Sequence, residues 1–206
     1  MFIVFEGGEG SGKSTQARAL HRRLERRGVP AVLTFEPGGT ELGNHVRNLI
    51  KNKKKISILP ETELFLFAAS RIQLIDEIIK PALEKGKVVV CDRFSFSTLA
   101  YQGYGRRLSL SMLRQVNEQA LQGIRPDLVI LLDLPPELGF VRRKKHHDRF
   151  ESMDLNFHKR VRKGYLEMAA ADPKNWKVID ASLTRKSINS IIWNAVEQLL
   201  KEHEQI

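Results

Sequence analysis

The sequence contains a single cysteine, Cys91, among its 206 residues. One cysteine cannot form an intramolecular disulfide, which argues against a disulfide-stabilised secreted domain and makes a reducing cytoplasm the expected compartment. Long apolar runs are also missing, since none approaches the roughly 18 residues that a membrane-spanning helix needs. The apolar opening has no basic region before it and ends at Glu6, too early for a signal peptide. We therefore expect no membrane partner.

Acidic residues are in the minority. The chain has 34 lysines and arginines against 24 aspartates and glutamates, which gives a formal net charge of +10 and a pI near 9.9. This balance suits anionic partners such as nucleotides or nucleic acid. The basic runs, however, lack the interleaved aromatic residues of a surface that binds single strands. We therefore expect nucleotides, and no nucleic acid, as partners.

Glycine is concentrated near the start, in FEGGEGSGKST at positions 5–15. Its spacing fits G-x-x-x-x-G-K-[ST], a loop that wraps a polyphosphate. Glycines let backbone N–H groups approach phosphate oxygens, and the positive end of the following helix faces the same anion. Lys13 is predicted to reach the β- and γ-phosphates and Ser14 to bind Mg²⁺. The predicted donor-binding residues are Gly7, Gly8, Glu9, Gly10, Ser11, Gly12, Lys13, Ser14 and Thr15.

Short apolar segments alternate with helical patterns along the whole chain. Such segments are typical of parallel strands that are covered on both faces. The predicted strands are Phe2–Glu6, Ala31–Phe35, Lys87–Cys91, Leu128–Asp133 and Trp176–Ile179, and the predicted helices are Lys13–Arg27, Glu61–Glu84, Ser109–Leu121, Ser152–Ala170 and Arg185–His203. This alternation predicts one α/β domain over residues 1–206, a doubly wound five-stranded parallel sheet with ligands at the carboxyl ends of its strands.

Residues at the other strand ends narrow the class of phosphate-loop protein. Asp92 and Asp133 each follow an apolar strand, and either could be the acidic partner of Mg²⁺. A GTPase would need Asn-Lys-x-Asp after a late strand. The Asn52-Lys53 pair lies elsewhere and lacks the aspartate, which argues against a GTPase.

Six motifs together resemble the bacterial-type thymidylate kinase family, of the phosphate-loop nucleoside monophosphate kinases. They are FEGGEGSGKST, FEPGGTELG at 35–43, LFAASRIQ at 66–73, DRFSFSTLAYQG at 92–103, PDLVILLDLPPELG at 126–139 and DRFE at 148–151. They follow the family's order and spacing over about the first three quarters of the chain. The resemblance implies that ATP, with Mg²⁺, phosphorylates dTMP to dTDP, and that the enzyme is a homodimer.

The resemblance also implies an acceptor site for dTMP. Its residues would be Glu9, Glu36, Pro37, Phe67, Arg71, Arg93, Ser97, Thr98, Tyr101, Gln102 and Phe150. Phe67 and Arg71 lie one helical turn apart, so both project from one face, and they would stack on the base and donate to its carbonyl. Arg93 would hold the acceptor phosphate. From the residues alone, core packing of Phe67 and a surface ion pair of Arg93 remain open.

A basic segment at about 139–151 resembles the family's short lid. Lids of this kind close over the phosphoryl groups and add positive charge. Some relatives carry an arginine where this chain has Gly10, so the charge is expected from Arg149 and from Arg142 or Arg143. The predicted catalytic residues are these three with Lys13 and Arg93, and the predicted metal-site residues are Ser14, Asp92 and Glu151.

The expected activity is in-line transfer of the γ-phosphoryl group of ATP to dTMP. Another nucleoside monophosphate kinase is the alternative within the class. A nucleic-acid-linked ATPase is the alternative outside it, and only the basic charge favours that function.

Overall fold

The computed structural model describes residues 1–51, 57–142 and 149–204. Five parallel strands form one sheet in the order β2-β3-β1-β4-β5. Their bounds are β1 Phe2–Glu6, β2 Ala31–Phe35, β3 Val88–Asp92, β4 Leu128–Asp133 and β5 Trp176–Asp180. The predicted five-stranded parallel sheet flanked by helices is confirmed, and each predicted strand agrees within one residue at either end.

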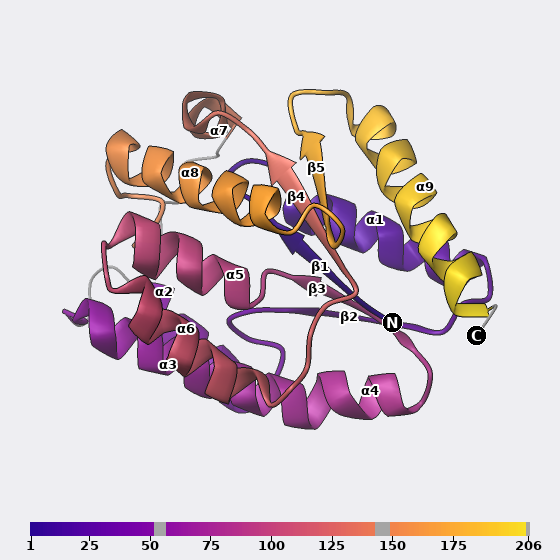
Figure 1. The fold of residues 1–206 in the computed structure, drawn as a ribbon, viewed down its shortest axis with the longest axis horizontal. Helices are drawn as coiled ribbons and strands as arrows, with labels where there is room; N and C mark the ends of the chain where they lie inside the picture. The colour runs from indigo at the N-terminus through magenta and orange to yellow at the C-terminus, as the bar shows by residue number, and fades with distance from the viewer. Residues whose placement is uncertain (52–56, 143–148, 205–206) are drawn as a thin grey trace.

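Helices cover both faces of the sheet (Figure 1). Their bounds are α1 Lys13–Arg26, α2 Glu41–Lys51, α3 Pro60–Leu74, α4 Lys80–Glu84, α5 Ser95–Thr98, α6 Leu110–Leu121, α7 Pro136–Arg142, α8 Leu155–Ala171 and α9 Arg185–Glu204. Two π-helical segments, η1 Ile75–Ile79 and η2 Leu99–Gly105, continue α3 and α5. The long helix predicted over 61–84 is thus one helical segment that changes its winding just before Pro81, whose ring cannot donate to the helical ladder.

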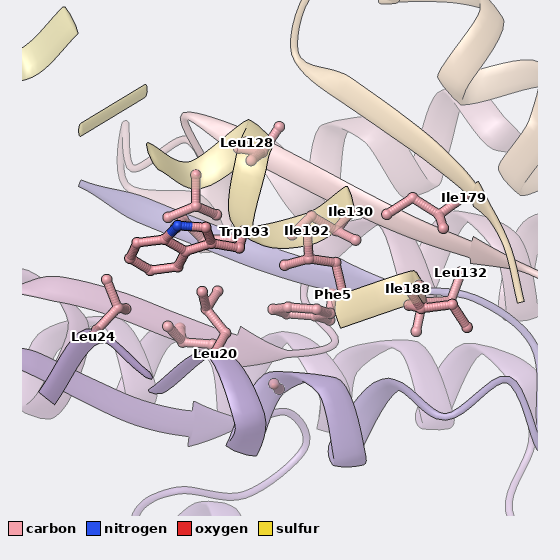
Figure 2. Packing of buried hydrophobic residues seen from close by; sticks show 14 of the residues in the cluster. Phe5, Leu20, Leu24, Leu128, Ile130, Leu132, Ile179, Ile188, Ile192 and Trp193 are labelled. Carbon is pink, nitrogen blue, oxygen red and sulfur yellow. The ribbon is translucent and has the colours of Figure 1, made fainter. Parts of the chain in front are cut away.

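Alternation along β1 divides the core into two sides. Ile3 and Phe5 pack with α1 and α9, whereas Phe2 and Val4 pack with α3, η1 and α4. Figure 2 shows the first side, where Phe5 and Leu20 lie near Trp193 of α9. Because every residue of β1 is buried, the strand is rigid, and it presents its carboxyl end to the loop that follows.

The structure adds helices that the sequence analysis did not predict. Helix α2 begins within the FEPGGTELG motif, and α5 with η2 carries the SFSTLAYQG stretch. Gly43 and Gly103 weaken the helical pattern in these segments because glycine disfavours helix interiors. Gly43 is needed for close packing, since a Cβ there would lie 2.8 Å from the Gly38 carbonyl oxygen, and a Cβ at Gly103 would lie 2.5 Å from the end of the Leu110 side chain.

Candidate active site

A cavity of about 720 Å³ lies at the carboxyl edge of the sheet. It is lined by residues that follow β1, β2 and β3, together with α2, α3, η2 and the end of the predicted lid. The predicted site residues that line it are Glu9, Gly10, Gly12, Lys13, Ser14, Thr15, Glu36, Pro37, Phe67, Asp92, Arg93, Ser97, Thr98, Tyr101, Gln102, Phe150 and Glu151. Residues far apart in the sequence therefore converge on one cavity.

The glycine-rich loop turns sharply between β1 and α1. Gly10 and Gly12 have φ values of 73° and 90°, a region that favours glycine, and α1 begins at Lys13. The Lys13 ammonium donates to the Gly8 carbonyl oxygen at 2.6 Å and to Ser11 Oγ at 3.3 Å. Burial, with the nearby Arg93 charge, lowers the pKa of Lys13 to about 8. Gly7, Gly8 and Ser11 shape the loop without lining the cavity.

The structure separates the two aspartates that follow strands. Ser14 donates a hydrogen bond from Oγ to Asp92, and both residues line the cavity. Asp133 instead accepts two bonds from Arg162 of α8, with Nε–Oδ1 2.7 Å and Nη2–Oδ2 2.9 Å. Hydroxyl and carboxylate oxygens are the ligands that Mg²⁺ prefers, so Ser14 and Asp92 fit this ion. The geometry favours Asp92 over Asp133 as its acidic partner.

Arg93 lines the cavity and contacts several of the polar groups around it. Its φ of 72° is unusual for a residue with a side chain. The guanidinium bonds Glu9 at 2.7 Å, the Tyr101 hydroxyl at 3.0 Å and the Gly7 carbonyl oxygen at 3.0 Å. Although burial favours the neutral acid, the charges of Arg93 and Lys13 lower the pKa of Glu9 to about 2. Arg93 thus joins the phosphate loop to Tyr101 of η2, and it is not a surface ion pair.

A second carboxylate, Glu6 at the end of β1, lies near Arg93 and was not predicted as a site residue. It is fully buried and accepts bonds from the Ser97 hydroxyl at 2.6 Å, the Tyr165 hydroxyl at 2.9 Å and the Phe94 backbone N–H at 3.0 Å. Burial raises the pKa of Glu6. Glu6 holds together the turn that follows β3, and its position at the end of a buried strand is the signal that could have revealed it.

Arg71 is fully buried behind the cavity wall. Its Nε bonds both oxygens of Glu36, at 3.1 and 2.9 Å, and a further bond joins Nη2 to Glu36. Nη1 and Nη2 also donate to Asn117 Oδ1 at 2.5 Å and to Thr98 Oγ1 at 2.7 Å. Burial raises the pKa of Glu36, against the opposing effect of Arg71. The structure therefore gives Arg71 a clear role in holding Glu36 and Thr98 at the cavity, and its contact with a base stays a prediction.

Three aromatic rings form one wall of the cavity. The Phe150 ring lies 6.0 Å from Phe67 and 5.8 Å from Tyr101, the second pair edge-to-face. They come from α3, η2 and the end of the predicted lid, so a flat apolar ligand would contact all three elements. Gln102, next to Tyr101, adds an amide to the same region. The helical pattern alone could not tell whether Phe67 packs in the core or lines a site.

The predicted lid arginines lie at different places. Arg142 ends α7 and donates from Nη1 to the Ala181 carbonyl oxygen at 2.7 Å, near the loop after β5. The Arg149 backbone N–H bonds the Lys51 carbonyl oxygen at 3.3 Å, which ties the end of the lid to α2. Neither side chain lines the cavity, whereas Phe150 and Glu151 do. Arg143 lies outside the described residues, so the catalytic roles of the lid arginines stay predictions.

Several cavity residues were missed by the sequence analysis. Arg47 and Lys51 of α2 add positive charge to the wall, and Arg47 donates to the Pro37 carbonyl oxygen at 2.8 Å. The others are Ala17, Arg18, Leu33, Thr34 and Phe35. Recognising α2 as a helix would have placed Arg47 and Lys51 on one face, because they are four residues apart.

The family model described as "Thymidylate kinase" matches residues 5–192. A thymidylate kinase of Dehalococcoides mccartyi is 49% identical over 202 residues, 98% of each chain. One of Deinococcus radiodurans is 46% identical over 200 residues, 96% of this chain and 97% of its own. The crystal structure of thymidylate kinase from Ehrlichia chaffeensis aligns with a TM-score of 0.78 and 35% identity, covering 95% of this chain and 98% of that one.

Proposed function

Because this chain belongs to the thymidylate kinase family, we propose that it uses ATP and Mg²⁺ to phosphorylate dTMP to dTDP. One observation carries this proposal: a single cavity joins the phosphate loop to an aromatic-walled region, and Arg93 contacts both. A donor site and an acceptor site that share one cavity allow direct transfer between two bound nucleotides.

The donor nucleotide would occupy the phosphate-loop side of the cavity. The backbone N–H groups of the loop and the start of α1 would bind the phosphates, and Lys13 would exchange its Gly8 carbonyl contact for phosphate oxygens. Ser14, Asp92 and Glu151 are the residues proposed to hold Mg²⁺, which would neutralise charge on the phosphates. A polyphosphate favours the charged form of Lys13, so binding is expected to raise its pKa from about 8.

The acceptor nucleotide would occupy the aromatic side. Phe67 would stack on the base, while Phe150 would pack against the sugar from the lid side. Arg93 would turn two of its donors, now on neutral oxygens of Gly7 and Tyr101, to the acceptor phosphate. Glu9 is proposed to face the sugar hydroxyl. The remaining proposed contacts come from Glu36, Pro37, Ser97, Thr98, Tyr101 and Gln102, with Arg71 behind them.

The chemistry needs positioning and charge neutralisation more than proton transfer. An oxygen of the acceptor phosphate is already anionic, so it can attack the γ-phosphorus in line without a strong general base. Lys13 and Arg93 would stabilise the charge on the transferring group from the floor of the cavity. The lid arginines Arg142, Arg143 and Arg149 are proposed to add charge from above, because Gly10 supplies none.

Two further parts of the proposal concern the assembly and its location. We propose a homodimer, supported by apolar side chains exposed along α2 and α3, where Leu42, Phe65 and Ile72 are 48%, 59% and 39% exposed. A cytoplasmic location is proposed from the single cysteine and the ATP-dependent family. Within the described residues, no helix combines the length and apolar character needed to cross a membrane.

An ADP-release assay across acceptors tests the proposed reaction. The purified chain would be incubated with ATP, Mg²⁺ and, in separate reactions, dTMP, dUMP, dCMP, AMP or single-stranded DNA. The proposal predicts fast release with dTMP and little with AMP or DNA. Fastest release with AMP would assign another monophosphate kinase, and DNA-stimulated release without dTMP dependence would assign a nucleic-acid-linked ATPase.

A further inference from the structure

Gln102 lines the cavity, and a hydrogen bond to Glu63 fixes the orientation of its side-chain amide. Its Nε2 donates to Glu63 Oε1 at 2.7 Å. A carboxylate has only acceptor oxygens, so the nitrogen of the amide must face Glu63. Gln102 is only 1% exposed but lines the cavity, and its amide oxygen accepts no hydrogen bond from the described residues, so this oxygen is the polar atom of the side chain that is left for a ligand.

Glu63 is itself held in a buried ion pair. It lies in the first turn of α3, is 0% exposed, and does not line the cavity. Arg106, just after η2, reaches it with Nη2–Oε2 3.2 Å and Nε–Oε1 3.4 Å. Charge-assisted bonds of this kind resist rearrangement because a lone buried carboxylate is costly. The pair therefore locks the donor end of the Gln102 amide.

The same arginine connects this pair to the aromatic wall. Its guanidinium carbon lies 5.9 Å from the Phe150 ring centroid and 5.8 Å from that of Phe157. Phe150 ends the predicted lid and Phe157 lies in α8, so Arg106 contacts both of these segments as well as Glu63. Glu63 thus fixes Gln102 within a rigid surrounding.

We propose that Glu63 is a specificity-determining positioning residue, which orients Gln102 so that its amide oxygen faces the acceptor base. An oxygen presented in this way accepts a hydrogen bond from a ring N–H, as at N3 of thymine or uracil. Cytosine carries a lone pair at N3, so two acceptors would oppose each other. This inference rests on the proposed acceptor site.

The consequence is discrimination by a group that never touches the ligand. A free glutamine could rotate its amide and serve either base, because its two ends differ only in donor and acceptor character. With the nitrogen committed to Glu63, rotation would put the amide oxygen against a carboxylate. Polar mismatches of this kind give strong rejection, since buried groups are left unpaired.

Glu63→Gln tests the proposal, because it keeps the side-chain shape and supplies an amide that can either donate or accept. The readout is kcat/KM for dUMP divided by kcat/KM for dCMP, two substrates that share an unmethylated C5. We expect Glu63→Gln to lower this ratio by about tenfold or more. Glu61→Gln is the matched control, since it removes the same charge from an exposed position in the same turn and should leave the ratio unchanged.

The remaining outcomes separate the explanations. An equal loss for both substrates in Glu63→Gln, with the ratio preserved, would show that Glu63 only supports the fold and would overturn the proposal. If that variant does not fold, Glu63→Asp keeps an acceptor-only group: a ratio near the wild-type value supports the proposal, and a ratio near one overturns it. Failure of the wild-type chain to phosphorylate dTMP would overturn the proposed function instead.

Discussion

Gly139, near the start of the predicted lid, has no room for a side chain. It lies in α7, and a Cβ placed on it would be 2.4 Å from the Glu9 carbonyl oxygen. Conversely, a Cβ on Gly10 would be 2.5 Å from the Gly139 carbonyl oxygen. The phosphate loop and α7 therefore touch through their backbones. We expect this contact to set the position of the loop relative to the lid.

Gly139→Ala should lower the catalytic rate while leaving the stability of the fold nearly unchanged. The added Cβ falls about 1 Å short of an ordinary contact distance, so the loop or α7 must move by that order, and such shifts can cost about a hundredfold in rate. Within the helix itself, alanine is favoured over glycine by about 1 kcal/mol, so α7 should not unfold. We expect kcat/KM for ATP to fall by about a hundredfold, with a melting temperature within a few degrees of wild type.

The assay is steady-state ADP release at saturating dTMP, paired with a thermal melt. Val141→Ala, a change at an 82% exposed position on the same helix, is the control and should behave as wild type. Turnover of Gly139→Ala within about threefold of wild type would refute the idea that this backbone contact positions the loop. A large fall in melting temperature that accounts for the lost activity would refute it equally.

Three further predictions concern charged residues. Above about pH 8, Lys13 loses its proton in the free protein. The affinity for a non-hydrolysable ATP analogue, measured by calorimetry, should therefore be full below that pH and fall by up to about tenfold per pH unit above it. A flat affinity profile up to about pH 9.5 would contradict the lowered pKa of Lys13. Arg71→Ala should lower the free energy of unfolding by about 3–5 kcal/mol in denaturant titrations, because it leaves Glu36 buried and unpaired. The KM for dTMP should rise by about tenfold or more. Unchanged stability would argue against a stabilising ion pair between Arg71 and Glu36. Arg149→Ala should lower kcat by about a hundredfold or more with little change in nucleotide affinity, and Arg149→Lys should recover little of that activity. Weakened ATP binding with a normal single-turnover rate would leave Arg149 only a role in binding.

The sequence was informative wherever a local pattern determined the structure. Uniformly apolar strands predicted the parallel sheet, and the spacing around Lys13 predicted the phosphate loop. Both patterns are local in the sequence, so they can be recognised without knowledge of tertiary contacts. The motif resemblance assigned Phe67, Arg93 and Tyr101 to one site, and in the structure all three line one cavity, while their contacts with dTMP stay predictions.

What the sequence could not supply depends on long-range pairing. The bond between Arg71 and Glu36 joins residues 35 positions apart, and nothing local distinguishes it from a bond to a ligand. Asp92 and Asp133 look alike as strand ends, and only the packing of α8 shows that Arg162 engages the second. Glu63 likewise reads as an ordinary helix-start acid until η2 brings Gln102 against it.

Direct observation of the product shows whether the chain joins a donor and an acceptor nucleotide in one cavity for phosphoryl transfer. Phosphorus NMR would follow a mixture of ATP, Mg²⁺ and dTMP with catalytic amounts of the protein, and Lys13→Ala would serve as the inactive control. With wild type we expect dTDP and ADP signals to grow in equal amounts, and with the variant we expect neither to grow. Growth of ADP and inorganic phosphate without dTDP would contradict this expectation, because the cavity would then be hydrolysing ATP and not transferring its phosphoryl group.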